Sequence, residues 1–517
     1  MPVTRRLFLP LLLIPAVFAQ ENLDSVVERT MKEFEVPGMA VLVVKDGRTV
    51  VSKGYGVRKL GESAPVTPKT LFGVASNTKA FTAAALAMLV EEGKLKWDDP
   101  VTGHLPGFQM ADPYVTHEMT IRDLLVHHSG LGLGAGDLMY FPTTDLSRDE
   151  IVRRLRHVKL SASFRSRYAY DNILFIVAGQ VVARVSGMSW DDFLRTRIFE
   201  PLGMHSTNTS VRKFRGGDEV AYPHAKADGK LCWLEPEDSD NWGAAAGVNT
   251  NLEDLSKWVL LQLGRGRSNG VKLFSAAQSR QMWSPVTIMT TRPATGPLAA
   301  VAPNFSTYAL GWNVSDYRGH KMVHHTGGLA GMVTRLTMIP EMQLGVVVLT
   351  NQEAGSAFNA VTYTVLDHYM GAAGTDWVEA LAAAQKKREA AAADTILKAG
   401  AKRDANSKPS LPLSADAGRY HDAWYGDVFV EEKDAKLRMR FSHTAELVGA
   451  MEHWQQDTFI VRWDKRSLLA DAYVTFALKP DGTVDQVKMA AVSPLTDFSF
   501  DFHDLLLKPA PKDAKPY

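Results

Sequence analysis

Ser76-Asn77-Thr78-Lys79 opens a stretch that continues Ala80-Phe-Thr-Ala-Ala-Ala-Leu-Ala-Met-Leu-Val90 and ends before Gly93. Its small and apolar residues recur with the spacing of one helix face, which predicts a helix from Asn77 to Glu92 that is closed by the glycine. On a helix, residues three apart lie on the same face, about one turn from each other. The sequence therefore predicts that this serine and this lysine meet at the start of a buried helix.

A serine and a lysine with this spacing suit nucleophilic catalysis. The Ser76 hydroxyl is a weak nucleophile until a neighbouring base takes its proton, and a desolvated Lys79 amine can be that base. The start of a helix also favours the negative charge that develops there. The same pattern recurs at Ser210-Val211-Arg212-Lys213, but that copy lies in a charged stretch with no apolar helix behind it. We interpret the second copy as a solvated loop.

Two further short motifs combine residues that could act on a substrate. Tyr170-Asp171-Asn172 directly precedes a second predicted buried helix, Ile173 to Val185, which Gly187 closes. Its aspartate or asparagine can cap that helix, and this does not displace a catalytic role for the tyrosine. His325-Thr326-Gly327-Gly328 follows a strand-like segment. Taken alone, it is typical of a strand end or of a turn built on a glycine pair.

The rest of the first 375 residues predicts a sheet combined with helices. Met39-Ala-Val-Leu-Val-Val44, a Lys45-Asp46-Gly47 turn and Thr49-Val-Val51 form a predicted hairpin. Arg335-Leu-Thr-Met-Ile339 and Leu344-Gly-Val-Val-Val-Leu349 are predicted neighbouring antiparallel strands, the second buried on both faces. Strands near both ends with helices between them indicate one sheet assembled from distant parts of the chain. This is an α+β fold with α/β-type layers.

Beyond about residue 375 the composition changes. Residues 376–410 are rich in Ala, Lys, Arg, Glu and Asp and then become polar, which predicts a solvated helix followed by a linker. Within residues 411–517, three segments alternate polar and apolar side chains, namely Leu437–Phe441, Phe459–Trp463 and Phe498–Phe502. This alternation predicts strands of a small all-β unit, a barrel or a sandwich.

Composition and charge exclude several classes of protein. The chain has 517 residues, enough for two or more domains, and 45% of them are hydrophobic, as expected for large globular cores. Lys plus Arg (58) nearly balances Asp plus Glu (57), so the usual electrostatic signature of nucleic-acid binding is missing. Cys232 is the single cysteine, which excludes an intramolecular disulfide and a thiolate metal cluster. We interpret it as a packing residue rather than a nucleophile.

The N-terminus predicts export. Residues 1–19 combine a basic start at Arg5 and Arg6, an apolar run from Leu7 to Phe18, and the small Ala19 at the predicted cleavage position. This pattern is typical of a secretory signal peptide, and the run is too short to span a bilayer comfortably. The paired arginines also fit a twin-arginine signal, so the general secretory route and the twin-arginine route both stay open. We expect a periplasmic or secreted protein whose mature chain has no membrane span.

Taken together, the three motifs resemble one known family. Ser76-x-x-Lys79, then Tyr170-x-Asn172 about 90 residues later, then His325-Thr-Gly327 about 155 residues further on resemble class C β-lactamases and penicillin-binding-protein-like serine hydrolases, including esterase and D-aminopeptidase-like members. The resemblance implies a hydrolase domain over residues 22–375, built as an antiparallel sheet flanked by helices plus a helical cluster. The C-terminal unit resembles the small β-barrel that is appended to some of these hydrolases.

By this resemblance, the reaction is acyl transfer. Ser76 attacks a carbonyl and forms an acyl-enzyme, while Lys79 and Tyr170 share the general-base work and protonate the leaving group. Water then hydrolyses the ester, activated by the Tyr170 hydroxyl. The substrate is a small molecule or a peptide, cell-wall-derived or a β-lactam among the possibilities.

Five more residues are assigned by the resemblance: Asn172, His325, Thr326, Gly327 and Gly328. Asn172 holds the substrate amide or the lysine, the oxyanion is bound by backbone amides of the nucleophile and of Gly328, and Gly327 gives substrate a close approach. Where many members have Lys-Thr-Gly, this chain has His325, which is mostly neutral at pH 7 and is no permanent clamp for a carboxylate. That departure favours esterases and peptidases, and we expect His325 to tune the Tyr170 side of the site.

Two other classes of function compete with a serine hydrolase. The pairs His127-His128 and His324-His325 could indicate a metal hydrolase, but the sequence has no His-Glu-x-x-His and no His-x-His-x-Asp, so we expect neither a metal ion nor a cofactor. A catalytically silent protein that binds cell-wall peptide is the second alternative, and the intact Ser-x-x-Lys motif argues against it. A β-lactam, a D-amino-acid peptide and an ester all pass through the same acyl-enzyme. The substrate, the role of the β unit and the oligomeric state therefore stay open.

Overall fold

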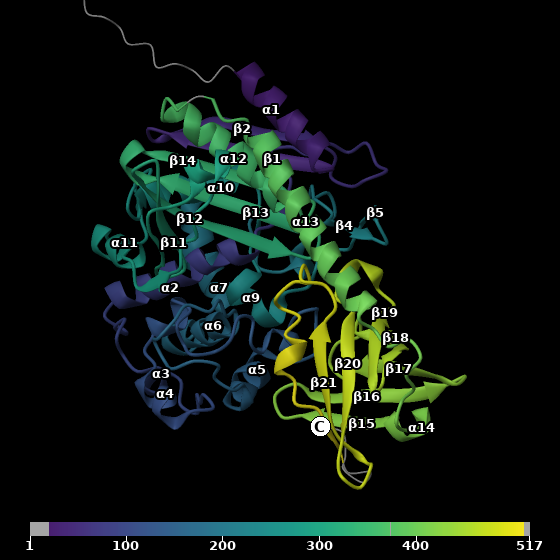
Figure 1. Cartoon of the computed structure of the whole chain (residues 1–517). Helices are drawn as coiled ribbons and strands as arrows, with labels where there is room; N and C mark the ends of the chain where they lie inside the picture. Colours follow the sequence, from purple (N-terminus) through teal and green to yellow (C-terminus); the bar gives the residue numbers. More distant parts are fainter. Residues whose placement is uncertain (1–19, 373, 511–517) are drawn as a thin grey trace, which may run out of the picture.

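The computed structural model describes residues 20–372 and 374–510. The predicted signal peptide, residues 1–19, lies outside the described residues. A large unit of sheet and helices is followed by the long helix α13 (Trp377–Ala401) and then by a smaller all-β unit (Figure 1). The predicted solvated helix is therefore present, and along its length only Trp377, Val378 and Ala392 are buried.

The large unit is built on one eight-stranded sheet whose strands come from both ends of that unit. The hairpin predicted near the N-terminus is confirmed, and its first strand pairs antiparallel with a strand that lies about 300 residues later. The two late strands predicted to be antiparallel neighbours are confirmed as well. In spatial order the strands are β2 (Arg48–Gly56), β1 (Gly38–Lys45), β14 (Leu344–Thr350), β13 (Met332–Ile339), β12 (His320–Leu329), β11 (Asn313–Tyr317), β10 (Ser306–Tyr308) and β9 (Thr287–Met289).

Helices bury both faces of this sheet, which explains the unbroken apolar runs of its central strands. In β1, Met39, Val41 and Val43 join the core beneath α1 (Gln20–Glu33) and α12 (Gly355–Tyr369), whereas Leu42 and Val44 join the opposite core. That opposite core is formed with α10 (Leu252–Leu263) and with the helical cluster beyond it. The layered α+β fold is thereby confirmed.

The helical cluster packs around two buried helices that the sequence predicted. The Ser-x-x-Lys stretch forms a 3-10 turn, η1 (Ala75–Thr78), followed by α2 (Lys79–Glu91), and the second helix is α6 (Ile173–Ser186), closed by Gly187. The remaining helices of the large unit are α3 (Val101–His104), α4 (Pro113–Glu118), α5 (Arg148–Arg154), α7 (Trp190–Leu194), α8 (Glu200–Leu202), α9 (Gly243–Ala246) and α11 (Ala276–Met282). Short strand pairs are β3 (Phe72–Gly73) with β6 (Asn249–Thr250), β4 (His224–Ala227) with β5 (Lys230–Trp233), and β7 (Arg267–Ser268) with β8 (Val271–Lys272).

The C-terminal unit is a nearly closed barrel of eight strands that follows the short helix α14 (Leu413–Asp416). The last strand pairs with the first strand of the unit, and a bridge from Leu507 to Val487 brings it against the opposite edge. In spatial order the strands are β21 (Val484–Ala491), β20 (Ala472–Leu478), β19 (Thr458–Trp463), β18 (Val448–Gln455), β17 (Lys436–Phe441), β16 (Gly426–Lys433), β15 (Gly418–Asp422) and β22 (Lys508–Pro509).

One of the three strands predicted for the barrel is wrong. The segments at 437–441 and 459–463 lie in β17 and β19, but Phe498–Phe502 forms turns and the start of a 3-10 helix. Its alternation has another cause: Phe500 and Phe502 are buried in the core, while Ser499 and Asp501, each directly before one of them, bond to the large unit. Tertiary contacts therefore override the period-two pattern at this position.

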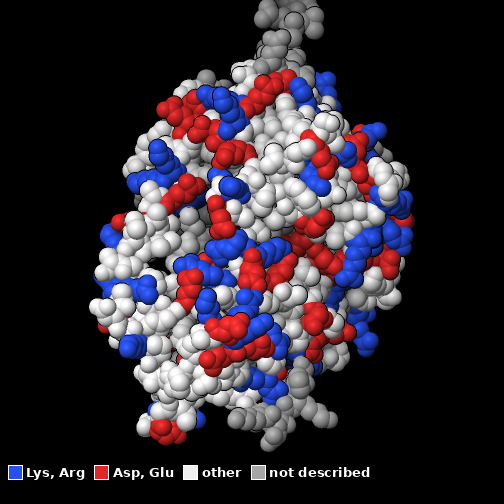
Figure 2. Space-filling model, turned by 90° about the vertical axis from the view of Figure 1, so that its right-hand side faces the viewer, with Lys and Arg blue, Asp and Glu red and all other residues white. Residues whose placement is uncertain are grey.

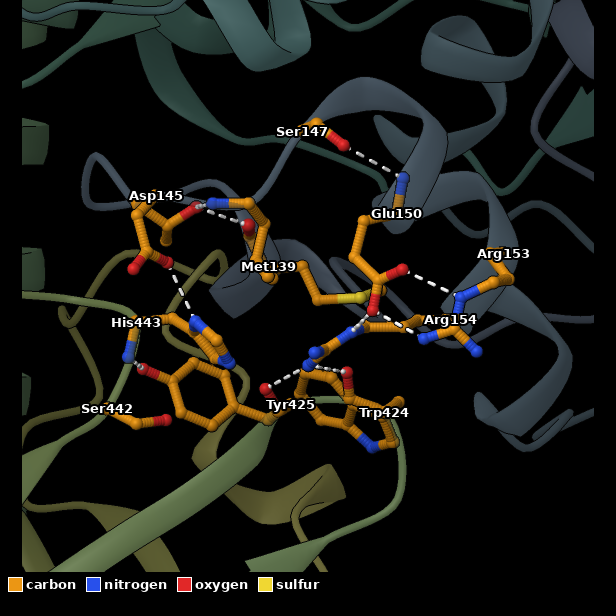
Figure 3. Close-up of polar contacts among 12 residues, drawn as sticks. Met139, Asp145, Ser147, Glu150, Arg153, Arg154, Trp424, Tyr425, Ser442 and His443 are labelled. Atoms are coloured by element: carbon orange, nitrogen blue, oxygen red, sulfur yellow. Dashed lines mark hydrogen bonds and ion pairs between the residues drawn. The ribbon is translucent and has the colours of Figure 1, made fainter. Parts of the chain in front are cut away.

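One group of polar contacts between the barrel and the large unit is drawn in Figure 3. Arg154 at the end of α5 is buried, and its guanidinium donates to the carbonyl oxygens of Trp424 and Tyr425 at 3.3 and 2.6 Å. Beside it, His443 of the barrel lies 2.7 Å from the Asp145 carboxylate. Both carbonyls belong to buried residues, so the arginine satisfies acceptors that water cannot easily reach.

Charge on the outside is mixed. On the face drawn in Figure 2, Lys and Arg side chains alternate with Asp and Glu side chains, in keeping with the near-zero formal net charge. Over the described residues, no single helix is long and apolar enough to cross a membrane. The segments Ile173–Ser186 and Trp190–Leu202 reach that length and composition only together, and they are bent by 74° relative to each other.

The docking contact gives a stability prediction. We expect Arg154→Ala to lower the free energy of unfolding by ~1–3 kcal/mol, because two buried carbonyls lose their donor. Arg153→Ala is the matched control, since Arg153 bonds the same Glu150 but stays exposed, and we expect its effect to remain within ~0.5 kcal/mol. Urea unfolding followed by tryptophan fluorescence measures both, and equal losses for the two variants would contradict the interface.

Candidate active site

The nucleophile candidate Ser76 lies on a strained turn between β3 and α2. Ala75, directly before it, has φ of 48°, a left-handed conformation that non-glycine residues rarely adopt and that costs about 1–3 kcal/mol. The turn is locked by Asn77, whose amide donates to Thr334 Oγ1 of β13 at 2.9 Å, while that hydroxyl donates to the Val74 carbonyl at 3.0 Å. The sheet thus fixes the position of the Ser76 hydroxyl, which remains partly exposed.

Lys79 meets Ser76 as the sequence predicts. Its Nζ lies 3.0 Å from Ser76 Oγ and donates to Asn172 Oδ1 at 2.7 Å and to the Ala245 carbonyl at 3.2 Å. The side chain is completely buried. Desolvation lowers the pKa of the Lys79 amine to about 7, and only the charges of Asp137 and Asp171 oppose that shift. Near neutral pH this lysine can therefore hold or release a proton.

Tyr170 lines the same cavity as Ser76. The Ser76 side chain lies near the Tyr170 phenol and opposes the rise of the Tyr170 pKa, and Lys79 Nζ lies 4.8 Å from the centre of the Tyr170 ring. Burial raises the pKa of Tyr170 well above its usual range, so the phenol stays protonated at neutral pH. The ring is supported by His127, whose own ring lies 4.2 Å away, centre to centre. Tyr170 is therefore placed as a neutral donor and acceptor rather than as a phenolate.

Asn172 holds the lysine and is itself held by an aspartate that the sequence did not indicate. It occupies the N-cap position of α6, but its side chain makes no capping bond there. Instead, its Oδ1 accepts from Lys79 and its Nδ2 donates to Asp137 Oδ2 at 3.0 Å. Asp137 is completely buried, and desolvation raises its pKa to about 7 against hydrogen bonds from Tyr140, Ser499 and Asn172. Of the two roles expected for Asn172, the geometry supports holding the lysine.

His325 is a buried, neutral group. Its Nδ1 donates to the Thr326 carbonyl at 2.6 Å, and its Nε2 accepts from the Tyr308 hydroxyl at 2.7 Å. Burial and the nearby Lys79 lower the pKa of His325 to about 3, so it carries no charge near neutral pH. The expectation that this histidine is no anion clamp agrees with these contacts. Its ring centre lies 6.3 Å from that of Tyr170, on the side of the site where it was expected.

The residues after His325 divide between the two sides of β12. Thr326 and Gly328 are exposed and line the cavity in front of Ser76. Gly327 is buried, and a Cβ there would lie 2.2 Å from the Val74 carbonyl oxygen and 3.0 Å from the Ala75 Cβ. The lack of a side chain at Gly327 therefore lets the strand approach the turn that carries Ser76, which is a different role from the substrate approach expected from the sequence.

These residues open onto one cavity of about 570 Å³, within the range of small-ligand sites. Both units of the chain line it. The large unit contributes Ser76, Tyr170, Asn172, His325, Thr326 and Gly328, and the barrel contributes among others Lys465, Leu468, Phe498 and Phe500. The loop at 132–146, whose sequence carries no recognisable motif, supplies Leu133 and Phe141 to the cavity lining.

The other sequence candidates lie elsewhere or serve packing. Ser210 caps the 3-10 turn η6 (Val211–Lys213) by accepting from the backbone amide of Arg212; Arg212 and Lys213 are exposed, as expected of a solvated segment, but Ser210 itself is buried. His128 lies 2.7 Å from the Asp123 carboxylate. Across residues 20–372 and 374–510, no group of three or more His, Cys, Asp or Glu side chains is arranged to hold a metal ion. Cys232 is half-buried in β5.

Sequence reasoning missed four residues that shape the site: Asp137, Tyr308, Phe498 and Ser499. Asp137 follows a glycine-rich loop with no motif, and Tyr308 lies in a three-residue strand. Phe498 and Ser499 lie in a segment whose alternating polar and apolar residues predicted a strand of the barrel and not a contact with the site. No local signal identifies any of them, because each reaches the site through contacts between distant segments.

Known proteins are similar to this sequence over much of its length. The unguisins hydrolase ungD′ of Aspergillus campestris is 31% identical over 492 residues, which are 90% of this chain and 88% of that protein. The unguisins hydrolase ungD of Aspergillus violaceofuscus is 28% identical over 499 residues, covering 89% and 86%. The protein flp of Staphylococcus aureus strain COL is 25% identical over 335 residues, covering 64% and 63%.

Solved structures share the fold. The octameric penicillin-binding protein homologue from Pyrococcus abyssi superposes with a TM-score of 0.62 at 22% identity, covering 95% of this chain and all of that one. The class C beta lactamase from Rhodobacter sphaeroides gives a TM-score of 0.55 at 24% identity, covering 67% and 99%.

Family models match both units of the chain. The model described as Beta-lactamase covers residues 23–369, and a model described as a domain of unknown function (DUF3471) covers residues 402–509. The first match spans more than half of the sequence and includes every residue of the Ser-x-x-Lys, Tyr-x-Asn and His-Thr-Gly motifs. This chain therefore belongs to the Beta-lactamase family.

Proposed function

We propose that the protein is a serine hydrolase that forms an acyl-enzyme on Ser76 and cleaves an ester or an amide. The observation that carries the proposal is the buried Lys79 amine, 3.0 Å from the Ser76 hydroxyl, with its pKa lowered to about 7. Above that pH the amine is mostly neutral and can take the hydroxyl proton as the oxygen attacks a carbonyl. The hydrolase names of two relatives, each covered over more than 85% of its length, support the same class of reaction.

In the proposed cycle, Lys79 and Tyr170 carry a proton twice, first from Ser76 to the leaving group and later from water to Ser76. Ser76 transfers its proton to Lys79 during attack, and the leaving group receives a proton from Lys79 through the Tyr170 phenol. Water then takes the place of the leaving group, loses a proton to the same pair and attacks the ester. When the acid departs, Lys79 returns a proton to Ser76. Because the phenol keeps a pKa well above its usual range, we assign Tyr170 as a relay and Lys79 as the base.

Two backbone amides are proposed to hold the oxyanion, those of Ser76 and Gly328. Gly328 is exposed on the cavity wall, and no atom other than a Val333 methyl carbon at 3.9 Å lies near the position of a Cβ there. Fixed amide donors of this kind act where charge develops, and removal of one donor costs ~10²–10³ in rate in characterised enzymes. The close packing at Gly327 is what keeps this strand beside the nucleophile.

The neutral His325 narrows the proposed substrate. A histidine with a pKa of about 3 supplies no cation for a substrate carboxylate, so we assign esters and peptides ahead of penicillins. Two relatives are named for hydrolysing unguisins, which supports an amide or ester substrate for this chain as well. Export through residues 1–19 is part of the same proposal, with the protein acting in the periplasm or outside the cell.

The alternative, a silent protein that binds cell-wall peptide, is tested directly by labelling. We expect a fluorophosphonate probe to add one adduct to the protein, located at Ser76 by mass spectrometry, and Ser76→Ala to take none. On p-nitrophenyl acetate, a D-alanyl p-nitroanilide and nitrocefin, we expect turnover of the ester or anilide to exceed that of nitrocefin. We expect Ser76→Ala to lower kcat/KM by ~10⁴-fold or more. Binding of peptide without any adduct would contradict the hydrolase.

The lowered lysine pKa predicts a pH dependence of acylation. Below pH 7 Lys79 is charged and cannot accept a proton, so the labelling rate should fall about tenfold per pH unit and level off above pH 7. Lys79→Arg should lose ~10²–10⁴ in rate at every pH, because the guanidinium stays protonated. His325→Gln is the control, and it should leave the midpoint unchanged, since His325 does not titrate in this range. A midpoint that follows His325 instead would contradict the assignment.

A further inference from the structure

A turn of the barrel reaches into the active site of the large unit. Phe498 packs edge-to-face on Tyr170, with ring centres 5.9 Å apart. Gly134 fits beneath it only because it has no side chain, since a Cβ there would lie 2.7 Å from the Phe498 carbonyl oxygen. The Asp501 carboxylate accepts from the backbone amides of Gly136 and Leu138 at 2.7 and 3.1 Å. The turn Asp497–Phe502 is therefore held firmly against the loop that carries Asp137.

Hydrogen bonds continue from this turn to the nucleophile. Ser499 Oγ donates to Asp137 Oδ2 at 2.7 Å, and the same oxygen accepts from Asn172 Nδ2 at 3.0 Å. Asn172 Oδ1 then accepts from Lys79, which reaches Ser76. Ser499, Asp137, Asn172 and Lys79 are all buried. The chain of bonds joins residue 499 of one unit to residue 76 of the other.

We propose that Ser499 is a positioning residue for this reaction: its hydroxyl holds the Asp137 carboxylate in the orientation that fixes Asn172 and, through it, Lys79 against Ser76. The active site is thus completed by the C-terminal barrel. The inference rests on the proposed hydrolase function. It gives the C-terminal barrel, which matches a domain of unknown function, a part in the chemistry of the large unit.

The orientation of the Asn172 amide is the physical link. Above its pKa of about 7, Asp137 is an ionised carboxylate that only accepts hydrogen bonds, so the Nδ2 donor of Asn172 turns toward it and Oδ1 is left for the lysine. A protonated Asp137 could donate to Oδ1 instead, and the amide would then turn its donor toward Lys79. Loss of the Ser499 donor favours that protonated state, because a buried carboxylate needs donors to stay ionised.

The effect on pH dependence follows from the charges around Lys79. With Asp137 neutral, one of the two carboxylates that raise the pKa of Lys79 is removed, and the pKa falls. The acidic limb of the rate profile should therefore move to lower pH while its plateau decreases. The titratable groups that face Lys79 and Asp137 from all packed elements are Asp137, Asp171, Tyr170, Tyr140, His127, His325, Asp497 and Asp501.

The test compares three serine variants of the full-length protein by fluorophosphonate labelling from pH 5 to 9. We expect Ser499→Ala to lower the plateau rate ~10–100-fold and to move the midpoint to lower pH. Ser499→Thr keeps a hydroxyl, so we expect its plateau rate and its midpoint to stay close to those of the unsubstituted protein. Ser493→Ala is the matched control, since Ser493 lies in the same loop and caps only the Leu495 amide, and it should label like the unsubstituted protein.

Several outcomes would overturn the inference. Equal rates and equal pH profiles for Ser499→Ala and the unsubstituted protein would overturn it while leaving the hydrolase intact. If Ser499→Ala lowers the plateau labelling rate without moving the midpoint of the pH profile, the role of Ser499 is merely structural. The same conclusion follows if Ser499→Thr loses as much rate as Ser499→Ala. Circular dichroism at the assay temperature confirms that each variant is folded. If the unsubstituted protein takes no label, the proposed function fails and this inference fails with it.

Discussion

The Lys79 amine is completely buried and yet bonds the Ser76 hydroxyl, and the site is arranged around that constraint. An amine taken out of water keeps a proton poorly, so the neighbouring carbonyl, amide and carboxylate groups decide its charge. Each of these partners comes from a different part of the chain: Asn172 from the start of α6, Ala245 from α9, Asp137 from a loop. The large helical cluster is needed because no single segment could enclose the lysine and still leave the serine open to substrate.

The sheet supplies the second requirement, a fixed position for the proposed nucleophile Ser76. Thr334 of β13 binds Asn77 and the Val74 carbonyl, and Gly327 of β12 presses against the same turn, which holds Ala75 in a strained conformation. β13 and β12 are the two central strands of the eight-stranded sheet, and β13 is buried along almost its whole length, so the turn rests on a densely packed part of the unit. Strain at the serine is thereby supported by the fold as a whole.

Local patterns predicted much of this, and their failures have physical causes. The hairpin, the two late strands, both buried helices and the meeting of Ser76 with Lys79 follow from periodicity and spacing, which are properties of short segments. Asp137 and Ser499 could not be predicted, because their function arises from contacts between residues about 360 apart. Phe498–Phe502 alternates like a strand, but its polar residues bond to the other unit. Gly327 was assigned to substrate, since sequence does not reveal which neighbour occupies the space that a glycine leaves free.

The protonation state of Lys79 tests the central claim most directly. The protein can be labelled with lysine carrying ¹³C at Cε and ¹⁵N at Nζ, and the Lys79 resonance can be identified by its loss in Lys79→Arg. Its chemical shift is then followed from pH 5 to 11. Desolvation against the charges of Asp137 and Asp171 predicts a midpoint near pH 7, well below that of the exposed lysines. A Lys79 that stays charged up to pH 10 would contradict a buried base and, with it, the role assigned to every residue that surrounds the amine.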